Sequence, residues 1–340
     1  MKTHGLSLLA FAGAALGGSL LSYLVLDNGL VGARGASPSP TISSAHAPAI
    51  PACGFDIKRV SGFHRVGPLL STESACESPR LSGLRSSITT MMEGLRASGQ
   101  LSSASVYVRD FHTDEWTWYN GSAEYDPGSL LKLPLLITYL SMAEDDPDLL
   151  QRTWTCEPMD FNVPQHTAFP SEQARLHVSY TVEQLLDLAI SHSDNRATVM
   201  LMRRVKVDRY IRAYTELGLP APDMQGKSYR MNVRDYSVFM KALFNSAILG
   251  PLGSEYALEL MTRADFVRGL SAGLPPGIEI AHKFGEAGTD QERQLHETGL
   301  VYAKGSPYLI TVMTSGPNVD TLASAIASVS KLVYERMSTP

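Results

Sequence analysis

The strand patterns of this chain fall in two groups that are far apart in the sequence. The stretches SASVYVRD (103–110) and EWTWYNG (115–121) alternate apolar and polar residues around a polar turn, which predicts a β-hairpin. GIEIAHKFG, HETGLVYAKG and PYLITVMTSG, all between 277 and 316, predict three more antiparallel strands. We therefore expect both ends of the folded region to build one sheet.

The stretch between these strand groups is helical in pattern. The predicted helices cover residues 129–143, 181–191 with a capping box of Thr181 and Gln184, 196–217 in one or two pieces, 232–244 and 254–263. Amphipathic helices are also predicted at 81–98 and 322–337. The expected fold class is α/β (α+β) and two-lobed: an antiparallel sheet flanked by helices, with an inserted all-α lobe.

The residues before 81 divide into three segments. Leu6–Leu26 is a run of 21 residues without charge, about 32 Å long as a helix against a hydrocarbon core of about 30 Å. We expect residues 1–33 to be a transmembrane anchor or a signal segment, with the catalytic domain outside the cytoplasm. Residues 34–52, rich in Ser, Pro and Ala, read as a linker, and 53–80 as an N-terminal extension of the domain over 81–340.

Charge and cysteine content limit the partners and the compartment. The net charge is −5, and no basic run could follow a phosphate backbone, so we expect a small molecule or peptide substrate rather than nucleic acid. Export would allow Cys53 and Cys76 to form a disulfide, with Cys156 left over, although all three could equally stay reduced. The nine histidines are scattered and suggest no metal, and no cofactor is expected. The sequence gives no indication of the oligomeric state.

Ser129 and Lys132 stand where an apolar helix begins, directly after Asp126, Pro127 and Gly128. Three residues along a helix bring the lysine to the same face as the serine. A serine hydroxyl becomes a nucleophile only when a nearby base removes its proton, and a lysine can do so only if burial or a positive neighbour lowers its pKa. This pair predicts a reactive serine.

Two further short motifs follow in the chain. Ser193, Asp194 and Asn195 lie 64 residues after Ser129, between two predicted helices. Lys283, Phe284 and Gly285 lie 90 residues further on, at the end of a predicted strand. Each motif has a simple structural explanation, a helix cap and a strand edge, but their order Ser-x-x-Lys, Ser-Asp-Asn, Lys-x-Gly is much harder to obtain by chance.

In these motifs the region from 81 to 337 resembles class A β-lactamases and related penicillin-binding serine hydrolases. The phrases YDPGSLLKLPLL, YTVEQLLDLAISHSDN and GLPPGIEIAHKFGEAG are similar too. The resemblance implies a β-lactamase-like fold and a hydrolase acylated at Ser129 by a β-lactam or an acyl-D-Ala-D-Ala-like amide. It implies four catalytic residues, Ser129, Lys132, Ser193 and Lys283, and substrate contacts by Asn195, Phe284, Gly285 and Glu286.

In that resemblance each residue has a role. Lys132 is the base or part of a proton relay, Ser193 passes a proton to the leaving group, and Lys283 holds the substrate carboxylate. Asn195 contacts the substrate amide. The backbone N–H groups of Ser129 and Glu286 form the oxyanion hole, which does not depend on side-chain identity.

The sequence departs from the family at two points. Phe284 stands where the family usually has Thr or Ser, so a hydroxyl that helps to hold a carboxylate is missing. The Glu-x-x-Leu-Asn motif, whose carboxylate activates the deacylating water, is absent. Glu216 belongs to a predicted helix, and Asp223 is the only nearby acid that could substitute. We therefore expect slow deacylation, closer to a penicillin-binding D,D-carboxypeptidase-like enzyme, and a non-catalytic binding module is the alternative.

Two other serine motifs compete for the role of nucleophile. Gly269, Ser271 and Gly273 spell Gly-x-Ser-x-Gly, with Asp290 and His296 after them, but this motif requires a strand before the serine and a helix after it. Neither is predicted at that place. Ser328 and Lys331 repeat Ser-x-x-Lys inside the last helix and are expected to be surface residues.

Overall fold

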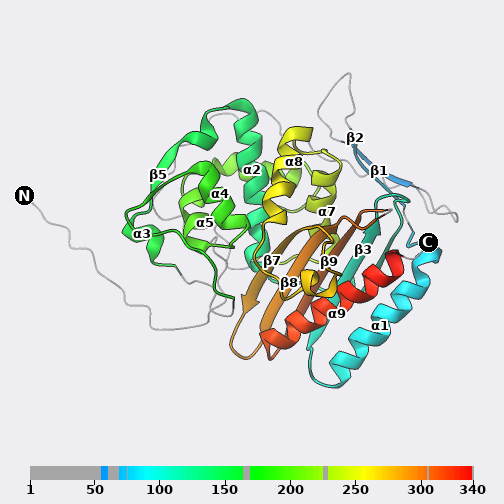
Figure 1. Ribbon diagram of the computed structural model, residues 1–340. Helices are drawn as coiled ribbons and strands as arrows, with labels where there is room; N and C mark the ends of the chain where they lie inside the picture. Colours follow the sequence, from blue (N-terminus) through cyan, green and yellow to red (C-terminus); the bar gives the residue numbers. More distant parts are fainter. Residues whose placement is uncertain are drawn as a thin grey trace, which may run out of the picture.

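The computed structural model describes residues 55–59, 69–74, 76–163, 169–224, 229–304 and 306–338. Its central element is a five-stranded antiparallel sheet in the order β4-β3-β9-β8-β7 (Figure 1). The strands are β3 (Ser103–Asp110), β4 (Trp116–Tyr119), β7 (Ile280–Gly288), β8 (Arg293–Val301) and β9 (Tyr308–Gly316). The hairpin of β3 and β4 joins the three strands β7, β8 and β9 through the pairing of β3 with β9, in which Ser103 lies opposite Ser315. The prediction that both ends build one sheet is confirmed.

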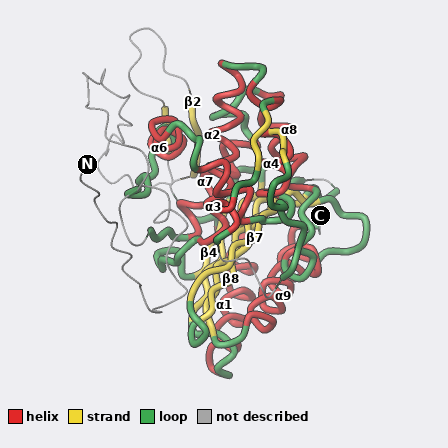
Figure 2. The backbone as a smooth tube through the Cα atoms, turned by 90° about the vertical axis from the view of Figure 1, so that its left-hand side faces the viewer, coloured by secondary structure: helices red, strands yellow, loops and turns green. Residues whose placement is uncertain are grey.

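Two helices from opposite ends of the folded region cover one face of this sheet. They are α1 (Ser82–Ala97) and α9 (Val319–Met337), which lie side by side in Figures 1 and 2. Helix α1 buries Leu84, Ile88 and Met92, which are spaced four residues apart and so lie on one side of the helix. Helix α9 starts three residues earlier than expected, because the side chain of Asn318 caps it.

The other face of the sheet carries the helical lobe that the sequence predicted. Helix α7 packs on β3, β8 and β9, and α8 packs on β7. The helices of the lobe are α2 (Lys132–Asp145), α3 (Pro158–Phe161), α4 (Val182–Ile190), α5 (Asn195–Met202), α6 (Val207–Thr215), α7 (Val233–Phe244) and α8 (Pro251–Thr262). The capping box of Thr181 and Gln184 is present, and the range 196–217 is divided into two helices.

Several short elements were not predicted. Strands β1 (Phe55–Arg59) and β2 (Leu69–Ser74) form a separate antiparallel pair, as do β5 (Thr153–Thr155) and β6 (Ser179–Thr181). Short 3₁₀ helices are η2 (Pro79–Leu81), η3 (Gly128–Leu131), η4 (Leu149–Gln151) and η5 (Leu270–Gly273). Pairs of three to six residues carry too weak a period to stand out in a sequence.

The predicted anchor Leu6–Leu26, the linker 34–52 and Cys53 lie outside the described residues. Within the described part of the chain, none of the helices combines the length and the apolar character that crossing a bilayer requires. Cys156 is a buried thiol, while the pairing proposed for Cys76 involves a residue that the structure does not describe. The anchor, the disulfide and the segment boundaries remain predictions.

Candidate active site

Ser129 lies in a tight turn rather than in a regular α-helix. The 3₁₀ helix η3 holds Ser129, and α2 begins only at Lys132, so the predicted helix over 129–143 starts three residues late. Gly128, which precedes the serine, has φ +51°, a left-handed conformation that glycine adopts easily. A Cβ atom at this position would also lie 2.3 Å from the carbonyl oxygen of Glu286. Glycine is therefore required next to Ser129 for two reasons.

Strand β7 runs against the same turn. A Cβ atom on Gly285 would lie 2.5 Å from the carbonyl oxygen of Pro127 and 2.8 Å from the amide nitrogen of Leu130. The backbone of β7 can come this close only because residue 285 has no side chain. The two segments expected to supply the oxyanion-hole N–H groups, at Ser129 and at Glu286, are thus in direct contact.

Lys132 points from the start of α2 to the loop before α5. Its Nζ contacts the carbonyl oxygen and, at 3.1 Å, the Oγ of Ser193, and it lies 2.7 Å from Oδ1 of Asn195. The loop is held by Asp194, which accepts hydrogen bonds from the N–H groups of Arg196 and Ala197 as the cap of α5. Ser193 itself has φ +53°, and such left-handed non-glycine residues are concentrated at functional sites.

Lys283 reaches the same hydroxyl from strand β7. Its Nζ lies 2.9 Å from Oγ of Ser193 and 2.8 Å from the carbonyl oxygen of Phe284. The hydroxyl of Ser193 therefore bridges two lysines that come from the helical lobe and from the sheet. The structure brings together Lys132, Ser193, Asn195 and Lys283, and places Ser129 three residues before Lys132.

Burial lowers the pKa of both lysines. The side chains of Lys132 and Lys283 are almost fully buried, at 2% and 1% exposure, and Ser129 and Ser193 are buried as well. Loss of solvation and then the charge of Lys283 hold the pKa of Lys132 well below its ordinary value of 10.5. Loss of solvation lowers the pKa of Lys283 to about 7, against the opposing effect of two carboxylates, Asp265 and Glu297.

Nζ of Lys132 donates three hydrogen bonds, to the carbonyl oxygen and Oγ of Ser193 and to Oδ1 of Asn195. Lys283 donates to the same Oγ. When Lys132 loses a proton, the carbonyl oxygen and Oδ1, which can only accept, use its two remaining N–H groups, and its lone pair can accept a proton from the hydroxyl of Ser193. The arrangement can therefore pass a proton between the two lysines.

Phe284 lies in an aromatic cluster beside Lys283. Its ring stacks on Phe266 with ring centroids 4.3 Å apart and meets Phe169 edge-on at 5.9 Å. Nζ of Lys283 is 4.4 Å from the centroid of the same ring, within the range of a cation–π contact. The phenylalanine that replaces the expected hydroxyl is therefore a buried packing residue that also contacts a lysine of the site.

Residues that the motifs did not indicate hold the chain just before Ser129. Nε2 of His296 on β8 donates to the carbonyl of Asp126, while Nδ1 accepts from the N–H of Thr314. Gln294, two residues earlier on β8, accepts from the N–H of Asp126. Burial lowers the pKa of His296 to about 4, so this link works with a neutral ring. The sequence showed His296 only as part of another motif.

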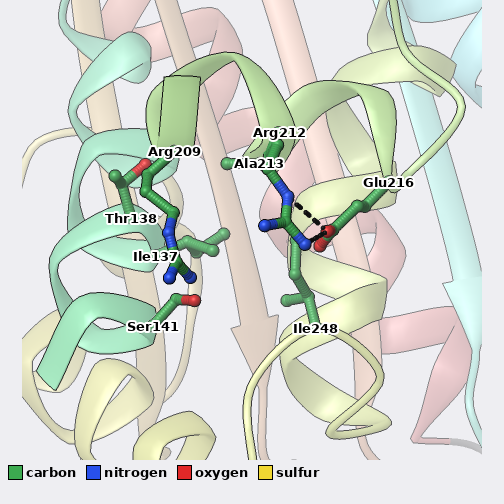
Figure 3. A pocket seen from close by; sticks show the side chains of 8 residues that line it. All are labelled: Ile137, Thr138, Ser141, Arg209, Arg212, Ala213, Glu216 and Ile248. Carbon is green, nitrogen blue, oxygen red and sulfur yellow. Dashed lines mark hydrogen bonds and ion pairs between the residues drawn. The ribbon is translucent and has the colours of Figure 1, made fainter. Parts of the chain in front are cut away.

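The two acids considered for deacylation have different surroundings. Glu216 directly follows α6 as its C-cap and pairs with Arg212, beside a small hollow between α2 and α6 (Figure 3). The residues lining this hollow include none of the four catalytic candidates. Asp223 is exposed, in the segment that follows α6. The predicted helix over this region ends earlier than expected, so Glu216 caps α6 rather than lying within it.

The alternative serine motifs lack the geometry of a nucleophile. Ser271 lies in the short 3₁₀ helix η5, with no strand before it, and Asp290 pairs with Arg293. His296 is engaged with Asp126, as described above. Ser328 and Lys331 are exposed on α9, as expected. Within the described ranges, no group of three or more His, Cys, Asp or Glu side chains is arranged to hold a metal ion.

A family model matches most of the chain. Residues 84–337 match the model described as a β-lactamase enzyme family, Beta-lactamase2. This range includes the five-stranded sheet, the helical lobe and all the site residues named above. No curated protein sequence matches the chain.

Solved structures share the fold at low sequence identity. The structure of PBP-A is 24% identical, with a TM-score of 0.61 over 74% of this chain and 95% of its own. A variant of PBP-A, solved as an acyl-enzyme complex with penicillin G, is 23% identical with the same TM-score and coverage. A class A β-lactamase from Mycobacterium abscessus is 17% identical, with a TM-score of 0.61 over 74% of this chain and 100% of its own. At such identities the likeness establishes the fold alone.

Proposed function

This chain belongs to the β-lactamase enzyme family, and on that basis we propose that it is a serine hydrolase acylated at Ser129. The proposed substrates are β-lactams or acyl-D-Ala-D-Ala-like amides. The observation that carries the proposal is that Lys132 and Lys283 both contact Oγ of Ser193. Lys132 is also only three residues after the proposed nucleophile, Ser129. The acyl-enzyme complex of the PBP-A variant supports the choice of substrate class.

The proposed acylation follows from these positions. Oγ of Ser129 attacks the carbonyl carbon while its proton passes to Lys132, either directly or through Ser193. The resulting oxyanion is stabilised by the N–H groups of Ser129 and Glu286. The C–N bond then breaks, and the leaving nitrogen takes its proton from the hydroxyl of Ser193, which Lys132 or Lys283 reprotonates. Lys283 in its charged form attracts the substrate carboxylate.

Deacylation is proposed to be slow, as in a penicillin-binding D,D-carboxypeptidase-like enzyme. The sequence has no Glu-x-x-Leu-Asn motif, and Glu216 is paired with Arg212. The carboxylate that the family uses to activate the water attacking the acyl-enzyme is therefore missing from its usual motif. The acyl-enzyme would therefore accumulate.

Intact-protein mass spectrometry with penicillin G tests the proposal. We expect one acyl adduct, loss of that adduct in Ser129→Ala, and an unchanged adduct in the control Ser271→Ala. A chromogenic β-lactam should give a burst of one equivalent followed by slow turnover. Sustained fast turnover would contradict slow deacylation, and absence of any adduct would favour a non-catalytic binding module. Release of D-Ala from an acyl-D-Ala-D-Ala peptide would identify the carboxypeptidase activity.

We further propose that Leu6–Leu26 anchors the domain on the outer side of a membrane. The uncharged run is long enough to cross the hydrocarbon core. Membrane fractionation combined with the mass of the mature chain distinguishes an uncleaved membrane anchor from a cleaved signal peptide. A chain that has lost its first 30 to 35 residues would indicate a cleaved signal peptide instead.

A further inference from the structure

Pro134 removes a hydrogen-bond donor close to the proposed nucleophile. It is the third residue of α2, and proline has no backbone N–H. In a regular α-helix the N–H of residue 134 would bond to the carbonyl oxygen four residues earlier, which belongs to Leu130. Leu130 directly follows Ser129 and is fully buried. Its carbonyl group therefore lacks the donor that a regular α-helix would supply, and a donor from another element can take that place.

Tyr236 supplies such a donor. Its hydroxyl lies 2.8 Å from the carbonyl oxygen of Leu130, although 106 residues separate the two in the chain. The N–H of Lys132 also contacts this oxygen, but from only two residues away, within the 3₁₀ turn itself. Tyr236 thus links the turn to another element, helix α7, on which it is fully buried against Phe239.

The hydroxyl of Tyr236 keeps its proton throughout the working pH range. Burial raises the pKa of Tyr236 well above its ordinary value of 10, so this group acts only as a neutral hydrogen-bond donor or acceptor. A carbonyl oxygen can only accept, which fixes the direction of the bond.

The turn is then held from three sides. His296 binds the carbonyl of Asp126 before the serine, and Gly285 of β7 packs against the N–H of Leu130. Tyr236 binds the carbonyl on the far side of the same residue. Without it, the peptide group between Leu130 and Leu131 would lose its hydrogen bond to α7 and could rotate.

We propose that Tyr236 is a positioning residue whose hydroxyl replaces the backbone donor that Pro134 removes and so holds the Ser129 turn in its reactive geometry. The inference rests on the proposed acylation of Ser129. Tyr236 itself touches neither the substrate nor the serine hydroxyl in this role. It acts through the carbonyl of Leu130.

The test combines Tyr236→Phe with Pro134→Ala. Tyr236→Phe removes only the hydroxyl, and we expect the rate constant for acylation by penicillin G to fall about tenfold, equivalent to about 1.4 kcal/mol. Pro134→Ala restores an N–H at the position that normally bonds to Leu130. In the Tyr236→Phe background it should recover most of the lost rate, whereas in the wild-type background it should change the rate little.

Tyr210→Phe is the matched control. Tyr210 is also fully buried, and its hydroxyl lies 2.9 Å from that of Tyr214 rather than next to the turn. We expect this variant to lower the melting temperature by about 2 to 4 °C, as loss of a buried hydrogen bond does. Its acylation rate should equal that of the wild type.

The melting temperatures of the wild type, both single variants and the double variant provide a second readout. These four proteins form a double-mutant cycle, in which the general effect of Pro134→Ala on helix stability cancels. A remaining interaction energy between positions 134 and 236 then indicates that both act on the carbonyl of Leu130. If the cycle shows no interaction, the proposal that the hydroxyl of Tyr236 replaces the donor removed by Pro134 is wrong, whether or not the enzyme is acylated. If the interaction is present but Tyr236→Phe acylates at the wild-type rate, Tyr236 is only structural. Failure of the wild type to form any adduct would instead overturn the proposed function.

Discussion

Nζ of Lys283 and Oγ of Ser193 lie 2.9 Å apart, although they are 90 residues apart in the chain and belong to different lobes. The same hydroxyl contacts Lys132 at 3.1 Å. Two buried amines that share one hydroxyl cannot both carry a charge without strong repulsion. The protonation of Lys132 therefore depends on that of Lys283. This coupling should appear in the pH dependence of acylation.

Acylation should slow down as the pH rises through about 7. Burial lowers the pKa of Lys283 to about 7, so the charge that attracts a substrate carboxylate is present below this pH and lost above it. We expect the second-order rate constant for acylation by penicillin G, which reports the free enzyme, to fall above pH 7 by up to about tenfold per pH unit. Stopped-flow measurements between pH 5.5 and 9 check this.

The control for this pH profile is Lys283→Arg. Arginine stays charged over the whole range, so the decrease above pH 7 should disappear in this variant even if the maximum rate is lower. The same decrease in both proteins would show that another group causes it.

Gly285→Ala should abolish most of the acylation. Its Cβ atom would lie 2.5 Å from the carbonyl of Pro127, so β7 would have to move away from the Ser129 turn. A displacement of about 1 Å at a reacting centre costs roughly 100-fold in rate, which the acylation assay can measure. Gly83→Ala on α1 is the matched control, because no atom lies within 4 Å of its added Cβ. A Gly285→Ala protein with wild-type kinetics would mean that β7 does not contribute to the site.

Phe284→Thr should destabilise the protein rather than improve substrate binding. The ring of Phe284 is packed against Phe266 and Phe169, and loss of a buried phenylalanine ring costs about 3 to 5 kcal/mol. Chemical denaturation measures this loss. The exposed Val267→Thr serves as a control, with an expected change within about 0.5 kcal/mol. Tighter binding of β-lactams with unchanged stability would argue that a hydroxyl at 284 faces the substrate.

His296 should make the protein less stable in mild acid. Burial lowers the pKa of His296 in the folded state to about 4, below the 6.5 of an ordinary histidine. Between these values the unfolded chain binds a proton that the folded protein does not, so the free energy of unfolding falls as the pH drops from 6.5 to 4. The loss amounts to about 3 kcal/mol, because one pKa unit corresponds to about 1.4 kcal/mol.

Urea unfolding of the wild type and of His296→Gln at several pH values isolates this effect. Glutamine does not titrate, so the difference between the two proteins should shrink as the pH falls from 6.5 to 4 and stay constant below pH 4. A difference that does not change with pH would show that His296 is not the titrating group.

The elements that the sequence predicted well have long and regular patterns. The five strands and the helices α1, α4, α7 and α9 were expected within four residues of their observed bounds. The helix at Ser129 was expected too early, because a glycine in the left-handed conformation and Pro134 turn its first residues into a 3₁₀ helix. The short pairs β1–β2 and β5–β6 were missed, since strands of three to six residues carry too weak a period to stand out in the sequence.

The sequence by itself determined the architecture and the residue types of the site, because strand and helix periods and the order of three short motifs are local properties of the chain. Only the tertiary structure decided how charged those residues are and what holds them. The lowered pKa values of Lys132 and Lys283 arise from burial between the two lobes. The bonds from Tyr236 to Leu130 and from His296 to Asp126 join residues more than 100 positions apart. Burial and long-range hydrogen bonds exist only once the lobes pack together, so no local pattern can indicate them.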